Sequence, residues 1–202
     1  MAKLKLTKTE LKTQNDALKQ YRRFLPTLQL KKQQLQLELR KSRALVEANR
    51  EAYRKLRGKL ESFVGLYAGT GAAQFIAANL RVIEVVRSEF NIAGVTVPVF
   101  DHVRFAVEPY DLFAAEFWFD AGLETVRELI ELLAAGKLLE EQYRLLEREL
   151  MTTTQRVNLF EKVKIPECLA NIRKIQISMG DESTAAVVRS KIAKRKMQEV
   201  AA

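Results

Sequence analysis

The sequence predicts a mainly α-helical fold, a long antiparallel two-helix coiled coil formed by the N- and C-terminal helices, with a small central α+β insert containing a β-hairpin. Two observations support this fold class. Residues 1–57 and 137–179 contain no glycine, which is typical of long helices. In both regions, apolar residues also recur at alternating steps of three and four, as the seam of a two-stranded coiled coil requires.

The first helix is predicted from an apolar stripe that keeps its phase from Leu4 to Phe63. Pro26 lies within this stripe, and because the phase continues across it we expect one helix that is bent there. A helix that begins at Pro26 is the alternative. The members of the stripe are Leu4, Thr7, Leu11, Gln14, Leu18, Tyr21, Leu25, Leu28, Lys32, Leu35, Leu39, Ser42, Val46, Asn49, Tyr53, Leu56, Leu60 and Phe63.

The C-terminal helix carries a second stripe of the same kind, whose phase slips by about one residue near Pro166. Two stripes of similar length separated by an insert favour an antiparallel pair of helices, and we expect Leu60 to lie opposite Leu139. The members are Leu129, Leu132, Gly136, Leu139, Tyr143, Leu146, Leu150, Thr153, Val157, Phe160 and Lys164, then Ile165, Cys168, Ile172, Ile175 and Met179.

Between the helices the hydrophobic period changes to two. Odd-numbered residues from Val95 to Val107 are mostly apolar, which predicts a strand with one buried face. Residues 81–90 are its predicted hairpin partner, across a turn with Asn91 and Gly94, and Pro98 indicates an edge strand. A short helix is expected at 72–80, after a glycine-rich hinge at 65–71. Aromatic residues Phe113, Phe117, Trp118 and Phe119 then lead into the C-terminal helix.

These assignments divide the chain into three parts. Residues 1–63 form the N-terminal coiled-coil helix, residues 64–118 the central insert with its hairpin at about 81–107, and residues 119–202 the C-terminal coiled-coil helix with a basic end.

Charge is spread unevenly along these parts. The chain carries a net +9, of which residues 1–60 contribute +12, residues 61–122 contribute −5 and residues 123–202 contribute +2. A basic helix suits nucleic acid, an anionic membrane surface or an acidic protein channel, so charge does not identify the partner. No apolar run is long enough to span a bilayer, and we expect any membrane contact to be indirect.

Catalytic signatures are missing from the sequence, so we expect a chain that is not an enzyme and has no cofactor or metal. The glycine-rich residues 65–71 lack the Lys-Ser/Thr pair of a phosphate-binding loop. The only histidine, His102, stands on the polar face of a strand, and the only cysteine, Cys168, lies on a helical stripe. Glutamates 140, 141, 147 and 149 alternate with arginines at helical spacing, which indicates solvated ion pairs.

Two polar segments stand out from the coiled-coil pattern. The run Thr152–Asn158 is poor in helix formers, and the stretch Arg189–Lys196 is strongly basic. Each segment either contacts a partner or has no function of its own. In the second case, Thr152–Asn158 is a stretch of helix with low intrinsic stability and Arg189–Lys196 is a solvated tail. The partner-binding candidates are Thr154, Gln155, Arg156, Val157 and Asn158, with Arg189, Lys191, Lys194, Arg195 and Lys196 at the basic end. The docking candidates on the insert are Val97, Val99, Phe100, His102 and Arg104.

The sequence resembles the D subunits of the V-type and archaeal-type rotary ATPases over its whole length. The resemblance rests on Thr154-Gln-Arg-Val-Asn-Leu-Phe-Glu-Lys-Val-Lys-Ile-Pro166, on Ile172-Arg-Lys-Ile175, on the opening Leu6-Thr-Lys-Thr-Glu-Leu11 and on Lys191-Ile-Ala-Lys-Arg-Lys196. The sequence departs from the family pattern at Phe160, Lys164 and Pro26.

This resemblance implies a non-catalytic central-stalk rotor that transmits torque between a catalytic head ring and a membrane rotor moving protons or sodium ions. The implied partners are the catalytic and non-catalytic head subunits (A and B), the small F subunit of the stalk and a funnel-shaped subunit above the membrane ring. The implied location is the cytoplasmic side of a membrane, in a peripheral membrane complex. No nucleic-acid partner is expected.

Two other functions are considered. The gamma shaft of F-type enzymes has the same helix pairing but a larger α/β middle domain than some sixty residues can form. A cytosolic coiled-coil scaffold or basic nucleic-acid clamp is the other alternative, and a clamp would bind DNA or RNA with a steep salt dependence. The few aromatic residues of the basic helix, Tyr21, Phe24 and Tyr53, mostly lie on or beside the seam, which argues against base stacking.

Overall fold

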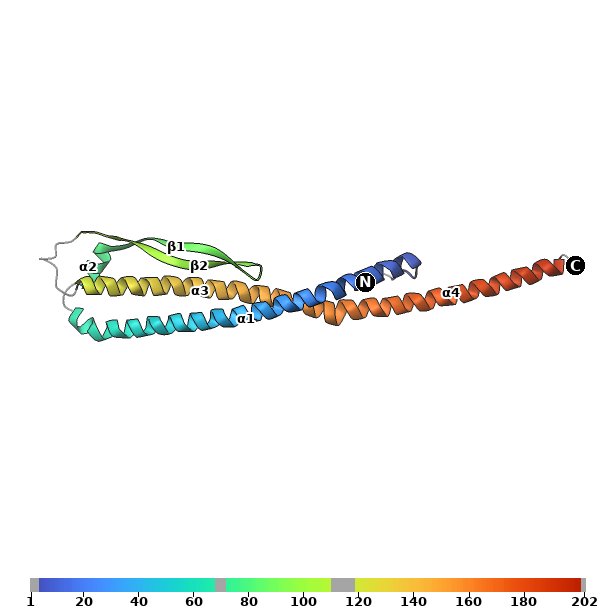
Figure 1. Ribbon diagram of the computed structural model, residues 1–202, viewed down its shortest axis with the longest axis horizontal. Helices are drawn as coiled ribbons and strands as arrows, with labels where there is room; N and C mark the ends of the chain where they lie inside the picture. The colour runs from blue at the N-terminus through green and yellow to red at the C-terminus, as the bar shows by residue number, and fades with distance from the viewer. Residues whose placement is uncertain (1–3, 68–71, 110–118, 201–202) are drawn as a thin grey trace. The chain divides into compact units, whose positions relative to one another are not determined.

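The structure is a computed structural model that describes residues 4–67, 72–109 and 119–200. Its elements, in chain order, are α1 (Lys8–Tyr67), α2 (Ala72–Asn79), β1 (Leu80–Ile92), β2 (Val95–Val107), α3 (Phe119–Leu159), the π-helical turn η1 (Phe160–Lys164) and α4 (Ile165–Val200) (Figure 1). The predicted fold class is confirmed. The predicted hinge at 65–71 and the residues Phe113, Phe117 and Trp118 lie partly or wholly outside the described residues.

The chain folds as two compact units. One comprises residues 1–32 and 152–202, and the other comprises residues 33–151. In each unit a segment of α1 packs against a segment from the C-terminal half of the chain, and the second unit also contains the hairpin of β1 and β2. The division into residues 1–63, 64–118 and 119–202 stays a prediction.

Helix α1 begins at a cap that the sequence encodes. The hydroxyl of Thr7 accepts a hydrogen bond from the backbone N–H of Glu10 at 3.3 Å, which satisfies one of the free donors at a helix start. The helix then continues without a break through Pro26. The alternative prediction, a helix that begins at Pro26, is therefore wrong. The apolar stripe, whose phase continues across Pro26, predicted the single helix correctly.

The predicted stripe of α1 is the face that the helix buries. From Leu11 to Leu60 no stripe member is exposed, whereas most of the residues between them are. The predicted register is wrong, however. Arg50, not Leu60, lies opposite the turn of α3 that contains Leu139 and Glu140, because the Arg50 guanidinium contacts the carboxylate of Glu140 at 2.7 Å.

The core of the second unit has three layers rather than two. Leu35 of α1, Leu146 of α3 and Val97 of β2 are all fully buried against one another. The hairpin therefore packs on the helix pair through β2, and the guanidinium of Arg127 on α3 lies 6.0 Å from the ring centre of Phe105 near the other end of the strand. Partly buried neighbours of this cluster are Leu39, Ile92, Ala93, Val95, Leu145 and Leu150.

The hairpin turns over two residues, Ala93 and Gly94. Both have positive φ angles, 51° and 82°, as a twist-matched two-residue hairpin turn requires. Glycine adopts this conformation freely, but alanine does so at a cost of roughly 1 kcal/mol. The side-chain oxygen of Asn91 accepts a hydrogen bond from the N–H of Gly94 at 2.9 Å, which helps to hold the turn that the sequence predicted.

The position of Pro98 follows from this turn. Ile92 pairs with Val95 and Glu89 pairs with Pro98. In an antiparallel ladder, hydrogen-bonded and non-hydrogen-bonded pairs alternate away from a two-residue turn. Pro98 therefore falls in a non-hydrogen-bonded pair, where the N–H that it lacks would point away from β1. Because the sheet has only two strands among the described residues, that outer side is a free edge.

The core of the first unit is a smaller helix-to-helix seam. Leu18 of α1 packs with Cys168 and Ile172 of α4. Beside them the rings of Tyr21 and Phe160 lie 5.0 Å apart in a tilted arrangement. Burial, followed by the nearby Glu167 carboxylate, raises the pKa of the Cys168 thiol, so this cysteine is a small core residue.

The phase slip near Pro166 has a structural cause. In η1 the N–H of Ile165 bonds to the carbonyl of Phe160, five residues back, so this turn contains one residue more than an α-helical turn. That extra residue moves the apolar stripe by one position. The wide turn also lies directly before Pro166, whose ring would clash with a carbonyl of a tightly wound preceding turn.

We expect the seam to dominate the free energy of unfolding. Leu35→Ala removes a side chain with no exposed surface and should destabilise the protein by about 2 to 5 kcal/mol. Leu37→Ala is the matched control on the same helix, because Leu37 is 54% exposed, and it should change stability by less than about 0.5 kcal/mol. Urea denaturation followed by circular dichroism measures both, and equal losses would contradict this account of the core.

A second prediction concerns the contact between Gly136 of α3 and Asn49 of α1. A Cβ atom on Gly136 would lie 2.7 Å from the side-chain oxygen of Asn49, so Gly136→Ala should not stabilise the protein. In an Asn49→Ala background that contact is absent. Gly136→Ala should then raise the free energy of unfolding by about 1 kcal/mol, because alanine has the higher helix propensity. A double-mutant cycle by urea denaturation measures the difference, and two additive substitutions would contradict the contact.

Candidate partner-binding surfaces

The polar run of α3 lies partly in the seam. Val157 is 4% exposed and Thr154 is half-buried, whereas Gln155, Arg156 and Asn158 are exposed. The predicted site residues therefore divide by helix face. The exposed three are available to a partner, and Val157 packs inside the chain.

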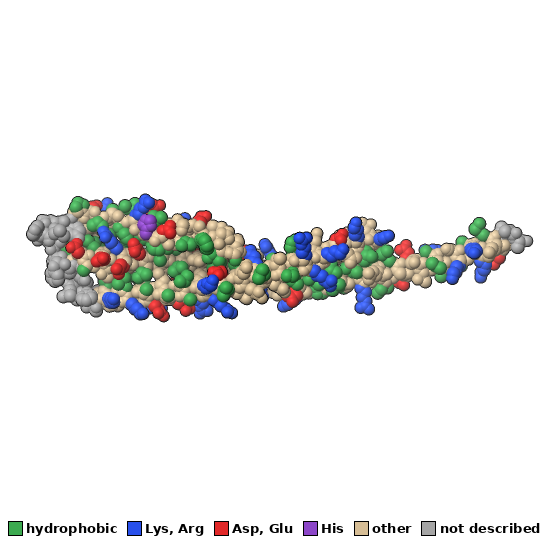
Figure 2. All heavy atoms as spheres, in the orientation of Figure 1, with side chains coloured by type: hydrophobic (Ala, Val, Ile, Leu, Met, Phe, Trp, Pro, Cys, Tyr) green, Lys and Arg blue, Asp and Glu red, His purple; other side chains and the backbone are tan. Residues whose placement is uncertain are grey.

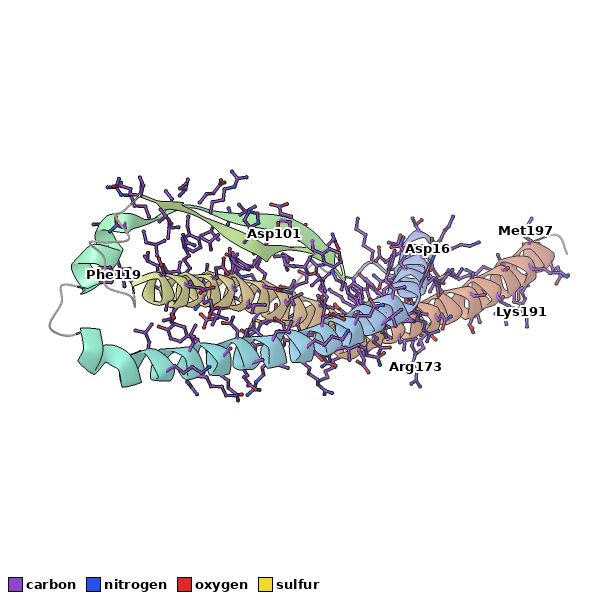
Figure 3. All side chains as sticks on the ribbon, turned by 60° about the vertical axis from the view of Figure 1, so that its left-hand side comes forward. Asp16, Asp101, Phe119, Arg173, Lys191 and Met197 are labelled. Atoms are coloured by element: carbon purple, nitrogen blue, oxygen red, sulfur yellow. The ribbon has the colours of Figure 1, made fainter. Side chains whose placement is uncertain are left out.

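The basic end of α4 stands away from the packed part of its unit. Every residue from 180 to 199 is exposed. The end of α4 extends beyond α1 (Figure 1), and Lys191 and Met197 lie on this end (Figure 3). The predicted candidates Arg189, Lys191, Lys194, Arg195 and Lys196 all belong to this segment. The segment is helical, so it is not a frayed tail.

This segment is apolar as well as basic, which the sequence prediction did not emphasise. Val187, Val188, Ile192 and Met197 are all exposed. Large apolar side chains on a helix without a packed neighbour are typical of a surface that binds another protein. The signal was visible in the sequence as apolar residues among the lysines and arginines.

The insert candidates also divide into buried and exposed residues. Val97 is fully buried between the helices, so it is corrected from a docking candidate to a core residue. Val99 and Phe100 are half-buried. His102 is exposed and lies on the surface of the hairpin (Figure 2). Arg104 is exposed and lies 3.6 Å from the Glu84 carboxylate.

Strand β1 carries an apolar surface that the sequence prediction missed. Its exposed large residues are Val82, Ile83, Val85 and Phe90, of which Ile83 at 66% and Phe90 at 61% are the most exposed. The sequence predicted residues 81–90 as the hairpin partner of the alternating strand but not which side of it is covered. Because β2 supplies the contacts to the helices, β1 is left exposed along most of its length.

A groove runs between α1 and α3 within the second unit. It has two parts, of about 530 and 420 Å³, that share Arg50 and Glu140. The first part is lined by Arg43, Val46, Glu47, Arg50, Glu140, Tyr143, Arg144 and Glu147. The second is lined by Asn49, Arg50, Tyr53, Arg54, Arg57, Leu132, Leu133, Gly136, Lys137 and Glu140. Sequence reasoning missed this groove because it depends on the register.

The described residues contain no group of three or more potential metal ligands. Among the same residues, no helix is both long and apolar enough to cross a bilayer.

Comparison with known proteins gives a consistent result. The family model of the ATP synthase D subunit matches residues 10–195. The V-type ATP synthase D subunit of Borreliella burgdorferi is 43% identical over 96% of this chain and 95% of its own length. The corresponding proteins of Chlamydia caviae and Chlamydia felis are 34% and 32% identical, each over 98% of this chain and 95% of the relative. The chain therefore belongs to the D-subunit family of V-type ATP synthases, as its sequence motifs predicted.

Proposed function

We propose that this chain is the central rotor shaft of a V/A-type ATPase or ATP synthase. In this role it transmits torque between the catalytic head ring, formed by the A and B subunits, and a membrane rotor that moves protons or sodium ions. Its other partners are the small F subunit and a funnel-shaped subunit above the membrane ring. The complex lies on the cytoplasmic side of the membrane, and the chain itself catalyses no reaction.

The uncovered end of α4 carries this proposal. A continuous exposed helix with apolar residues at 187, 188, 192 and 197 and five cations from 189 to 196 suits the inside of a protein collar. The apolar groups can slide against such a collar, and the cations give long-range attraction without fixing one orientation. A shaft must avoid one deep energy well, because a well would stop rotation.

The asymmetry of the second unit also supports a rotor. The hairpin packs through Val97 on one side of the α1 and α3 seam, and the groove around Arg50 and Glu140 opens beside the same seam. Identical head subunits arranged around a shaft would therefore face different surfaces at each angle. The exposed apolar side chains of β1 and the exposed His102 and Arg104 are suited to hold the smaller stalk subunits.

The nucleic-acid clamp is less well supported. Tyr21 stacks on Phe160 inside the first unit, and Tyr53 is half-buried in the groove wall. Phe24 is exposed, so one of the three rings on the basic helix is freely presented, whereas single-strand binders stack successive bases on several.

The proposal predicts that truncation after Gly180 abolishes the coupling of ATP hydrolysis to ion movement without preventing the chain from folding. Because all residues from 180 to 199 are exposed, the truncated chain should keep its core and its binding to the F subunit. It should fail to engage the head ring, so ion movement driven by ATP hydrolysis in reconstituted vesicles should fall to background. A full-length chain with Gln at 189, 191, 194, 195 and 196 is the control that separates charge from length.

Undiminished coupling in the truncated complex would show that this end is not a bearing element. Loss of cooperative urea unfolding in the truncated chain would contradict the placement of this segment outside the core.

A further inference from the structure

The outer edge of strand β1 is the strongest unassigned feature. We propose that, outside an assembled complex, two copies of this chain pair antiparallel along this edge and form one continuous four-stranded sheet. The proposal goes beyond the rotor function, since it identifies a partner of the free chain. The pairing covers part of the β1 surface that is suited to the smaller stalk subunits, so assembly competes with it.

Strand β1 presents an open edge, and β2 does not. Among the described residues the sheet has only these two strands, so each strand has one unpaired edge. On β2 that edge contains Pro98, which lacks the N–H that a further strand would need. On β1 it contains no proline, and all residues except Leu80, Val86 and Ile92 are exposed. An incoming strand can therefore add to β1.

Two irregularities of the hairpin define the segment that can pair. The ladder skips Ile83, so a bulge in β1 interrupts the regular edge there. The other shift places its extra residue, Asp101, in β2 and leaves β1 continuous. The regular edge therefore extends from Glu84 to Ile92, and its midpoint is Ser88.

The backbone of this segment matches a two-fold pairing about Ser88. Because Glu89 and Pro98 form a non-hydrogen-bonded pair, the N–H and C=O of Glu89 point away from β2. Those of Arg87, two residues away, point in the same direction. When a second β1 lies antiparallel with Ser88 opposite Ser88, Arg87 of each copy lies opposite Glu89 of the other. These residues then exchange backbone hydrogen bonds between the copies.

The side chains favour the same register. Arg87 and Glu89 are exposed, and neither has an ion-pair partner among the described residues. In the pairing each Arg87 lies beside a Glu89 of the other copy, so two cross-strand ion pairs form. Val86 lies opposite Phe90, which is 61% exposed in the free chain, and the small Ser88 occupies the two-fold axis.

The neighbouring registers are disfavoured by charge. A pairing with the same backbone pattern, shifted by two residues, is centred on Arg87 or on Glu89. Either shift places like charges directly opposite each other, which destabilises a strand pair. The charges of β1 are therefore complementary to a second copy of β1 in one of these three registers.

The helices leave part of this strand uncovered. Phe90 pairs with Val97 in the ladder, so both side chains lie on the face of the sheet that packs on the helices. Val97 is fully buried there, whereas Phe90 is largely exposed. The cover that the helices give to β2 therefore does not extend fully over β1, where the second copy adds.

The pairing stops at two copies. In the four-stranded sheet both outer edges belong to β2, and both contain Pro98, so no further strand adds. A two-fold contact also uses the same surface on both copies. The product is a closed dimer rather than a fibre. Because the contact is a single strand edge, its area is small and the dimer dissociates readily.

Charge reversal tests the pairing in solution. Arg87→Glu places two carboxylates opposite each other at both ion pairs, and Glu89→Arg places two guanidinium groups there. Each variant should raise the dissociation constant of the dimer by about tenfold or more. Lys55→Glu, a charge reversal at an exposed position of α1, is the control. Analytical ultracentrifugation of the isolated full-length chain over a concentration series measures the constants.

Mixing the two variants gives the sharper result. An equimolar mixture of Arg87→Glu and Glu89→Arg chains should dimerise again, because each copy then meets the opposite charge at both positions. Loss of folding in either variant cannot produce this recovery. Circular dichroism of each variant shows separately that the hairpin and the helices are retained.

A disulfide tests the register. Ser88 forms a hydrogen-bonded pair with Val99 inside the hairpin, so across the new contact the two copies of residue 88 form a non-hydrogen-bonded pair. Their Cα atoms are then about 4.5 Å apart, within the range of a disulfide. Oxidised glutathione should link Ser88→Cys chains through position 88, as mass spectrometry of the linked peptide shows. Thr96→Cys, at an exposed position of β2, is the control and should stay unlinked.

The proposal is overturned by any of four results: a chain that stays monomeric at every concentration, charge variants that dimerise like the unchanged chain, a mixture of the two variants that does not recover, or equal linkage at positions 88 and 96. If a charge variant fails to fold, the linkage at position 88 decides alone. These results leave the rotor function standing, since truncation after Gly180 tests it separately.

Discussion

The structure depends on a seam that is only one stripe of side chains wide. Two paired helices can bury little more than the residues that face each other, so a few fully covered side chains carry most of the packing energy. Leu35 and Leu146 do this in one unit, and Leu18, Cys168 and Ile172 do it in the other. The hairpin adds Val97 to the core that contains Leu35 and Leu146, which is why the second unit has a third layer.

The seam is not built for maximum stability. Ser42 and Thr153 occupy buried stripe positions that could have been apolar, and the hydroxyl oxygen of Ser42 has no hydrogen-bond partner among the described residues. A buried hydroxyl without a partner costs free energy that an apolar side chain would not. Polar groups in a coiled-coil seam do, however, discriminate between registers. Asn49, opposite Gly136, combines a polar group with a close approach of the two backbones.

The sequence predicted the elements well because their signals are local. A spacing of three and four residues and a period of two each act within a few turns of chain. The register of α1 against α3 could not be read in the same way, since it depends on which distant residue fits beside Gly136. The phase slip was visible in the sequence, but its placement in a wide turn at Phe160–Lys164 was not.

The candidate surfaces were predicted less well than the fold, for a related reason. Alternation shows which residues share a face but not what covers that face. Val97 was therefore taken for a docking residue although α1 and α3 cover it, and the exposure of Ile83 and Phe90 on the partner strand was not predicted. The basic end of α4 is exposed on all sides, so its charged residues are accessible on every face, and its role as a partner contact stays a prediction.

The exposed end of α4 also affects the chain before it is assembled. Residues 180–199 are all exposed, so little packing protects their backbone hydrogen bonds and this segment opens at lower cost than the buried seam. Proteases cleave opened segments, and exposed Val, Ile and Met side chains favour self-association. In the free chain, this helix is therefore the part most open to cleavage and self-association. Its exposure, rather than the stability of the packed cores, thus limits the lifetime of the free protein.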